Sequence, residues 1–234
     1  MDHVAMLKKY LKSRKTYDED FPCYPFVTIS RQAGAGGHTL ARDIVRAVEA
    51  ALPDDPGEGW EVFDHKLCLL IAQDPEISVS FEELLAERYR TEISQIVEDM
   101  VFGTARQYKL FKQIFQIVRG LAHVGKVVII GRAGNCVTAD MPMGVRIRLV
   151  ADMDTRVENM MQLLEVDRDE AVRAIKQQDA ERRKLIRDYF NKDIDDPHHY
   201  DAILNADRMS MKDMAALIAG LIARRVSESQ QLTE

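Results

Sequence analysis

The chain has 234 residues, of which 46% are hydrophobic and 30% are charged, and its formal net charge is −6. This length and composition fit an ordinary globular protein with one large domain. The negative charge argues against a general nucleic-acid binder, and no apolar run approaches the roughly 20 residues of a membrane-spanning helix. Cys23, Cys68 and Cys136 lack metal-ligand spacing, which is typical of reduced thiols in a cytoplasmic protein.

Five short β-like runs predict strands, and helical patterns fill the gaps between them. The predicted strands are Phe26–Ser30, Glu61–Phe63, Val127–Ile130, Arg146–Val150 and Ala202–Asn205. This alternation predicts an α/β fold with a parallel sheet and helices on both faces. The run Val127–Ile130 is continuously apolar, as expected of a central strand that is covered on both sides.

No strand pattern appears between Asp64 and Lys126, where helical spacing predicts helices over Phe81–Met100 and Gly103–His123. This stretch is too long for a simple crossover helix, so we interpret about 65–125 as a helical insert. Its apolar helices could pair between the subunits of a homodimer. The predicted organisation is an N-terminal helical extension at 1–20, a single domain at 21–228 and a tail at 229–234.

A glycine-rich turn follows the first predicted strand and leads directly into a helical pattern. The backbone N–H groups of such a turn, together with the helix N-terminus, can bind phosphate. The residues that would form this cradle are Gly34, Ala35, Gly36, Gly37, His38 and Thr39. The alternative is a plain strand-to-helix turn, although three glycines in four residues exceed what a turn requires.

The turn departs from the usual P-loop, which ends in Gly-Lys-Ser/Thr. Gly37 stands where the lysine would be, and His38 stands where the magnesium-binding hydroxyl would be. A unit-charge pair at contact is worth about 4 kcal/mol at an effective dielectric constant near 20, and Gly37 supplies none of it. Magnesium prefers oxygen ligands to a histidine. Nearby arginines such as Arg31 could supply the missing charge.

Four segments, in order, resemble the P-loop nucleoside monophosphate kinases, and most closely the cytidylate kinase-like family. They are Ile29–Ala41, Val62–Lys66, Ile129–Gly134, and Lys176–Phe190 with Asp196–Asn205. The resemblance covers most of residues 26–225. It implies a three-layer P-loop kinase-like fold with a five-stranded parallel sheet in the order 2-3-1-4-5, a helical insert, and a helical lid at about 167–197. It also implies ATP as a substrate and Mg²⁺, for which the sequence offers no clear protein ligand.

The resemblance assigns an acceptor site to the ends of the second and third strands. Asp64, with Lys66 two residues later, matches an aspartate that serves the acceptor nucleotide in cytidylate kinases. A helix N-cap is the alternative role for Asp64, and both roles can hold at once. Arg132 resembles an acceptor-phosphate arginine, whereas Ala133 replaces the aspartate of the family pattern, which puts the acceptor geometry in question.

The basic segment Lys176–Arg187 resembles the arginine-rich lid of these kinases. The resemblance implies that Arg182, Arg183 and Arg187 close on the γ-phosphate, where arginine can neutralise developing charge. Lys176 and Asp179 fall on nearly the same helix face. The alternative is a solvated helix with (i, i+4) ion pairs. Asp167 and Glu170 resemble a capping box that would start this helix. The adjacent His198 and His199 are interpreted as a helix start, and no metal site is predicted.

The leading hypothesis is a phosphotransferase that moves the γ-phosphoryl group of ATP or another nucleoside triphosphate to a small acceptor, most simply a nucleoside monophosphate such as CMP. The rival is a catalytically degenerate protein that binds a nucleotide or anion for regulation, as Gly37, His38 and Ala133 suggest. A dinucleotide-binding domain with Asp64 as the ribose acid is a weaker third hypothesis, because Thr39 stands where its third glycine would be.

Overall fold

The computed structural model describes residues 10, 24–52, 59–74, 78, 81, 93–98 and 107–231. Its centre is a five-stranded sheet in which all neighbours are parallel, in the order β2-β3-β1-β4-β5. The strands are β1 (Phe26–Arg31), β2 (Glu61–Phe63), β3 (Val127–Ile130), β4 (Gly144–Val150) and β5 (Ala202–Asn205). The predicted fold class and strand order are confirmed, and only β1 and β4 are longer than predicted.

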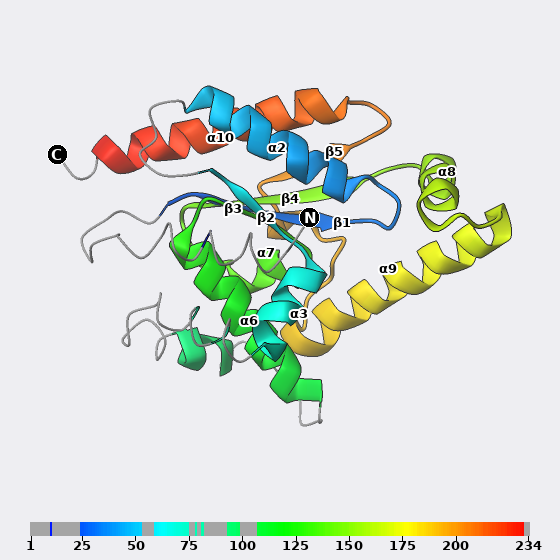
Figure 1. Ribbon diagram of the computed structural model, residues 1–234, viewed down its shortest axis with the longest axis horizontal. Coiled ribbons are helices and arrows are strands. Elements are labelled where there is room, and N and C mark those ends of the chain that lie inside the picture. Colours follow the sequence, from blue (N-terminus) through cyan, green and yellow to red (C-terminus); the bar gives the residue numbers. More distant parts are fainter. Residues whose placement is uncertain are drawn as a thin grey trace.

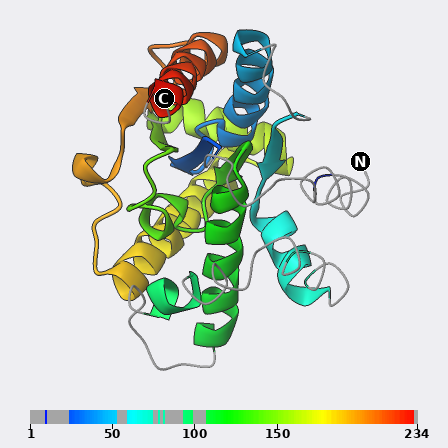
Figure 2. The same cartoon turned by 90° about the vertical axis from the view of Figure 1, so that its left-hand side faces the viewer.

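Helices cover both faces of the sheet, as Figures 1 and 2 show. The helices are α2 (Gly37–Ala51), α3 (His65–Gln73), α6 (Gln107–Val124), α7 (Gly134–Val137), α8 (Met153–Leu164), α9 (Arg168–Phe190) and α10 (Met211–Gln231), with a 3₁₀ turn η1 (Pro197–His199). Helices α2 and α10 lie side by side on one face, and α6 and α7 lie on the other. The sheet with a layer of helices on each face forms the three-layer arrangement that the family resemblance implied.

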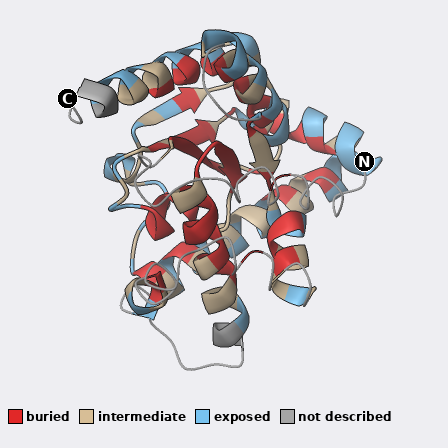
Figure 3. Ribbon diagram, turned by 60° about the vertical axis from the view of Figure 1, so that its left-hand side comes forward, coloured by how far each residue is buried: buried red, intermediate tan, exposed pale blue. Residues whose placement is uncertain are grey.

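The central strand β1 contributes to a separate apolar core on each face of the sheet. Val27 and Ile29 pack with α2 and α10, whereas Phe26 packs with Phe115 of α6. Successive side chains of a strand point to opposite faces, so a continuous apolar run is needed where both faces are covered. Figure 3 shows the resulting buried centre.

The predicted helical insert is described only in part. The helix predicted over Gly103–His123 is described from Gln107 and ends at Val124. Most of the helix predicted over Phe81–Met100 lies outside the described residues, although residues 93–98 are helical. Subunit pairing through this insert therefore stays a prediction. Among the described residues, no helix combines the length and the apolar character needed to cross a membrane.

Most of the predicted N-terminal extension also lies outside the described residues. Tyr10 is described, and it packs edge to face on Phe63 with ring centroids 5.2 Å apart. Its hydroxyl donates a hydrogen bond to the Gly125 carbonyl oxygen over 3.1 Å. At the other end of the chain, α10 extends to Gln231.

Helices α8 and α9 form a hairpin beside the loop that joins β1 to α2 (Figure 1). The N-cap of α9 is Asp167, whose carboxylate accepts a hydrogen bond from the Glu170 N–H over 2.8 Å, as the predicted capping pattern requires. Val157 and Met160 of α8, with Ala171 and Ile175 of α9, form an apolar cluster that includes Ala33 of the loop. The hairpin therefore packs directly on the loop.

The Asp179 carboxylate and the Arg156 guanidinium together fasten this hairpin to the loop backbone. Asp179 of α9 accepts hydrogen bonds from the Ala33 N–H over 2.8 Å and from Arg182 Nη1 over 3.0 Å. It also pairs with Arg156 of α8, and Arg156 Nε in turn donates to the Ala33 carbonyl oxygen over 2.7 Å. Both polar backbone groups of Ala33 are thus held by charged side chains.

We predict that Asp179→Ala lowers the free energy of unfolding by about 3–5 kcal/mol, because it leaves the buried Arg156 without its carboxylate. Urea unfolding followed by circular dichroism measures this change. Asp188→Ala is the matched control, since Asp188 lies on the same helix with a half-exposed side chain and, among the described residues, makes only a 3.7 Å ion pair with Arg187. Equal midpoints for the two variants would contradict the prediction.

Candidate functional site

The carboxyl ends of β1, β2 and β3 meet at one edge of the sheet, which is where ligands bind in open parallel sheets. At the end of β1 the chain enters the glycine loop. Gly34 and Gly36 have φ angles of 80° and 91°, in the region that favours glycine. A Cβ atom on Gly34 would lie 2.4 Å from the Arg156 carbonyl oxygen, and one on Gly36 would lie 2.5 Å from Met211 Cε.

The loop presents the start of α2 to the sheet edge. Gly36 is the N-cap, so no side chain caps the helix, and its first turn holds no acidic residue. The first N–H groups of a helix lack partners within the helix and carry partial positive charge. The Ala35 N–H, by contrast, donates to the Gln32 carbonyl oxygen over 3.3 Å. The groups best placed for an anion are therefore those of Gly37, His38 and Thr39.

The side chain of Arg31 runs from the end of β1 between this first helical turn and the end of β3. A Cβ atom on Gly37 would lie 3.2 Å from Arg31 Cγ, and one on Gly131 would lie 2.0 Å from Arg31 Nη1. Burial, with the neighbouring charges of Arg182 and Arg132, lowers the pKa of Arg31 to about 9. This value leaves the guanidinium protonated at neutral pH.

Arg132 lies in an unusual turn between β3 and α7. Gly131, Arg132 and Ala133 have consecutive φ angles of 77°, 52° and 54°. Two of these residues are not glycine, so the turn stores backbone strain, and such strain often occurs at functional sites. Burial lowers the pKa of Arg132, whereas the nearby Asp64 raises it. The turn thus places a cation beside Asp64, as the predicted acceptor site requires.

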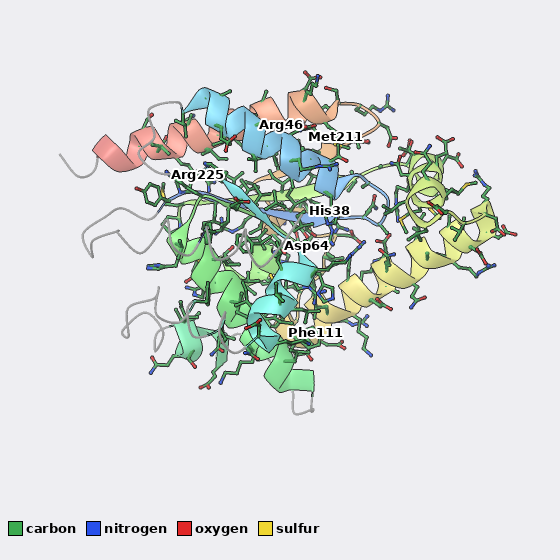
Figure 4. All side chains as sticks on the ribbon, in the orientation of Figure 1. His38, Arg46, Asp64, Phe111, Met211 and Arg225 are labelled. Atoms are coloured by element: carbon green, nitrogen blue, oxygen red, sulfur yellow. The ribbon has the colours of Figure 1, made fainter. Side chains whose placement is uncertain are left out.

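Asp64 is the N-cap of α3, and Figure 4 shows it close to His38 at the start of α2. Its Oδ1 accepts hydrogen bonds from the N–H groups of Lys66 and Leu67 over 2.9 and 3.1 Å, and its Oδ2 lies 3.4 Å from His38 Nε2. The hydrogen bond with His38, followed by those from the two N–H groups, holds the pKa of Asp64 well below its ordinary 3.8. Its contribution to stability is therefore lost only as the pH falls below that value.

The capping role of Asp64 is confirmed, and its acceptor role stays a prediction. Lys66 has an exposed side chain on α3, two residues after Asp64. Lys176 is also exposed, on α9, with no polar partner among the residues that the structure describes.

Sequence reasoning missed a buried arginine on β4. Arg148 pairs in register with Ser30 of β1, and its Nη1 donates to Ser30 Oγ over 2.9 Å. Its Nη2 donates to Asp195 Oδ1 over 2.7 Å. The Tyr200 hydroxyl lies 3.4 Å from the same serine oxygen. The signal was present, because Arg148 is a charged residue within the otherwise apolar run Ile147–Val150.

Two of the three predicted lid arginines reach the sheet edge. Arg182 and Arg183 line a small pocket together with Arg31, Arg148, Asp179 and Ile194. Arg183 Nε also lies 3.4 Å from Asp195 Oδ2. Arg187 is one turn further along α9, where it lines a neighbouring pocket of about 340 Å³ with Arg183, Asn191 and Lys192. Arg183 therefore borders both pockets, whereas Arg187 is not among the residues that line the pocket beside Arg31 and Arg148.

The arginines of this edge differ in how their charge is satisfied. Arg148 and Arg183 share Asp195, and Arg182 pairs with Asp179. Within the described part of the chain, Arg31 and Arg132 make no hydrogen bond or ion pair with another side chain. Both side chains are partly buried, and an uncompensated charge that is partly removed from water is unfavourable, so this edge is suited to an anion with several oxygen atoms.

The residues at this edge provide few ligands for a metal ion. Across the described ranges, no group of three His, Cys, Asp or Glu side chains could hold one. Mg²⁺ is usually held by one or two carboxylates plus substrate phosphates, and Asp64 is the acidic side chain at this point. Its Oδ1 already accepts two N–H groups, so a magnesium ion that arrives with a nucleotide would rely mainly on the phosphate oxygens.

Comparison with solved structures supports the fold. The crystal structure of an uncharacterized protein from Eubacterium ventriosum matches with a TM-score of 0.64 and 18% identity, over 85% of this chain and 97% of that chain. Shikimate kinase from Acinetobacter baumannii in complex with shikimate has a TM-score of 0.37 and 14% identity, over 92% of this chain and 98% of that chain. The second likeness is too weak to support an argument about function. No curated protein matches the chain significantly.

The comparison with family models gives the assignment. The model of the cytidylate kinase-like family matches residues 26–208, which contain all five strands, the glycine loop, Asp64, Arg132 and α9. This range is well over half of the chain and ends only after the last strand. The chain belongs to the cytidylate kinase-like family.

Proposed function

We propose that the protein transfers the γ-phosphoryl group of ATP or another nucleoside triphosphate to a small acceptor, most simply a nucleoside monophosphate such as CMP. Membership of the cytidylate kinase-like family supports a nucleotide or small-molecule kinase-like function. The observation that carries the proposal is the gathering of Arg132, Arg148 and Arg182 around Arg31, at the end of the strand that leads into the glycine loop.

In this proposal the triphosphate lies on the first turn of α2. The N–H groups of Gly37, His38 and Thr39 would donate hydrogen bonds to its β-phosphate, since a helix N-terminus favours anions. Arg182 and Arg183 of the lid line the pocket beside this turn, and they would contact the γ-phosphoryl group. The contact between Asp179 and Ala33 holds the lid helix against the loop, so these cations are positioned before the nucleotide arrives.

The acceptor would lie at the ends of β2 and β3. Asp64 would orient the acceptor nucleoside through its Oδ2, because its Oδ1 is engaged in capping α3. Arg132 would bind the acceptor phosphate, and the exposed Lys66 stands at the outer side of the same edge. This division places the donor on α2 and the acceptor between α3 and the β3–α7 turn.

The proposed reaction requires that the two substrates be positioned and that the charge on the transferring group be neutralised. An oxygen of the acceptor phosphate forms a bond to the γ-phosphorus while the bond from that phosphorus to the β–γ bridging oxygen breaks, and the nucleoside diphosphate leaves. The acceptor oxygen is already anionic at neutral pH, so no general base is required. Charge that spreads over the transferring group is stabilised by arginines in this reaction class.

The second candidate function is binding of a nucleotide or another anion without turnover. Gly37 and His38 remove the lysine and the hydroxyl of the usual loop, and Ala133 removes the family aspartate. Calorimetry separates the two functions, because tight ATP binding without any product would favour this candidate. Turnover with any nucleoside monophosphate would favour phosphoryl transfer.

We predict that Arg132→Gln raises the KM for the acceptor about tenfold to a hundredfold with little change in the KM for ATP. The expected size is that of a lost charge-assisted hydrogen bond. A coupled assay of nucleoside diphosphate formation measures both constants, with each common nucleoside monophosphate tested as acceptor.

Arg46→Gln is the control for that assay, because Arg46 is exposed on α2 and lies away from the sheet edge in Figure 4. Within the part of the chain that the structure describes, it pairs only with Asp43. Its kinetics should equal those of the unchanged protein. Absence of turnover with every common acceptor would exclude the proposed transfer. An equal acceptor KM for Arg132→Gln and Arg46→Gln would exclude the binding of the acceptor phosphate by Arg132.

Asp64 has two separable roles, which two substitutions distinguish. We predict that Asp64→Ala lowers the free energy of unfolding by about 1 kcal/mol through the lost cap, whereas Asp64→Asn leaves it nearly unchanged because the amide oxygen can still cap α3. Both variants should raise the acceptor KM about tenfold, since both remove the charge. Thermal unfolding and the coupled assay measure the two effects, and an unchanged KM in Asp64→Asn would leave Asp64 with a capping role alone.

A further inference from the structure

We propose that Arg31 binds the β- and γ-phosphates in place of the lysine that follows the loop glycine in the usual P-loop. The inference rests on the proposed function and names the cation that serves its donor site. Three independent features of the structure support it: the space that the side chain occupies, the lack of an anionic partner, and the rigidity of the strand that carries it.

The first feature is the space shared by Arg31 and residue 37. Gly37 does not have a positive φ angle, whereas Gly34 and Gly36 do. Its backbone would therefore accept other residues, and the atoms nearest to an added Cβ are Cγ, Cβ and Cδ of Arg31, at 3.2, 3.6 and 3.6 Å. A lysine at position 37 would compete with Arg31 for this space. The missing lysine and the presence of Arg31 are thus two parts of one arrangement.

The second feature is the position and partnership of the guanidinium. It lies against Gly131, where an added Cβ would be 2.0 Å from Nη1 and 3.0 Å from Cζ. Arg31 therefore reaches from the first turn of α2 to the end of β3. Within the described residues no carboxylate pairs with it, whereas Arg148, Arg182 and Arg183 each have one. A planar guanidinium can bind two phosphate oxygens at once.

The third feature is where Arg31 is attached. It is the last residue of β1, which pairs with β3 on one side and with β4 on the other, and Arg31 itself pairs in register with Leu149. A cation on the central strand needs little rearrangement when a ligand binds. Lid arginines, by comparison, depend on the docking of α9.

The experiment measures binding of ATP and of inorganic tripolyphosphate by calorimetry, using the full chain. Arg31→Gln should weaken the binding of both ligands by the same factor, about tenfold or more, because the lost contact is to phosphate. Arg46→Gln should bind as the unchanged protein does. Arg31→Gln should also unfold at an equal or higher urea concentration, since it removes a cation that has no protein partner; a structural arginine would lower the midpoint.

A second variant reaches Arg31 without changing it. Gly131→Ala places a methyl group where Nη1 now lies, so it should displace the guanidinium and weaken the binding of both ligands. Because Gly131 has a φ angle of 77°, the substitution also strains the turn, and its urea midpoint is measured beside the affinities to record that cost. Combined with Arg31→Gln, it should cause no further loss, because the two changes remove the same contact. In the Arg31→Gln background, Gly37→Lys should restore part of the affinity for both ligands. The arginine no longer fills the space beside residue 37, and the new lysine supplies the cation that the phosphates have lost.

The outcomes separate this proposal from the proposed function. If Arg31→Gln binds both ligands as the unchanged protein does, Arg31 has no phosphate role, even where turnover is found. If the unchanged protein binds ATP without turnover and Arg31→Gln loses that binding, the Arg31 proposal holds and phosphoryl transfer fails. If the unchanged protein binds neither ligand, both proposals are wrong.

Discussion

The contact between the Asp179 carboxylate and the backbone of Ala33 determines how the rest of the site is arranged. Ala33 begins the glycine loop, and its N–H and carbonyl groups are bound by Asp179 of α9 and Arg156 of α8. Both lie more than a hundred positions after Ala33 in sequence, so the loop receives its conformation from the α8–α9 hairpin as well as from its own glycines. In return, the same carboxylate orients Arg182 toward the sheet edge. A carboxylate that the resemblance places among cations of the lid thus acts first as the link between lid and loop.

The charge distribution around this link explains how a protein with a net charge of −6 can form an anion site. The arginines at the sheet edge outnumber the carboxylates that reach them, because Asp195 serves both Arg148 and Arg183. Asp64 is occupied mainly by the N–H groups of α3 and by His38. The excess cations are Arg31 and Arg132, which flank the loop on the β1 and β3 sides. Because low dielectric strengthens both repulsion among these cations and attraction to an anion, the local arrangement outweighs the net charge of the chain.

The parts of the fold that depend on local pattern could be predicted from the sequence. The continuous apolar run Val127–Ile130 indicated a central strand, and the capping pattern at Asp167 and Glu170 indicated where α9 begins. The strand order, by contrast, came from the family resemblance. Two other features could not be predicted from the sequence, because they depend on contacts between distant segments. One is the pair of hydrogen bonds from Arg148 to Ser30 and Asp195. The other is the contact of Arg156 with Ala33 and Asp179. The sequence showed that the lysine was missing, but only the structure shows what fills the space at Gly37.

That space changes how the loop should be compared with its relatives. A glycine in the lysine position, considered alone, suggests a loop that has lost function. Its nearest neighbours are the aliphatic carbons of Arg31, and a long basic side chain fits there only because residue 37 has none of its own. In the proposed arrangement the cation is placed at the end of a strand that is hydrogen-bonded on both edges, and not at the helix start. A lysine presents a point charge on a flexible stem, whereas arginine presents a planar fork, so a cation at Arg31 would bind phosphate with more directionality. For this loop the relevant question is whether a cation faces the phosphates, and the residue type at position 37 does not answer it.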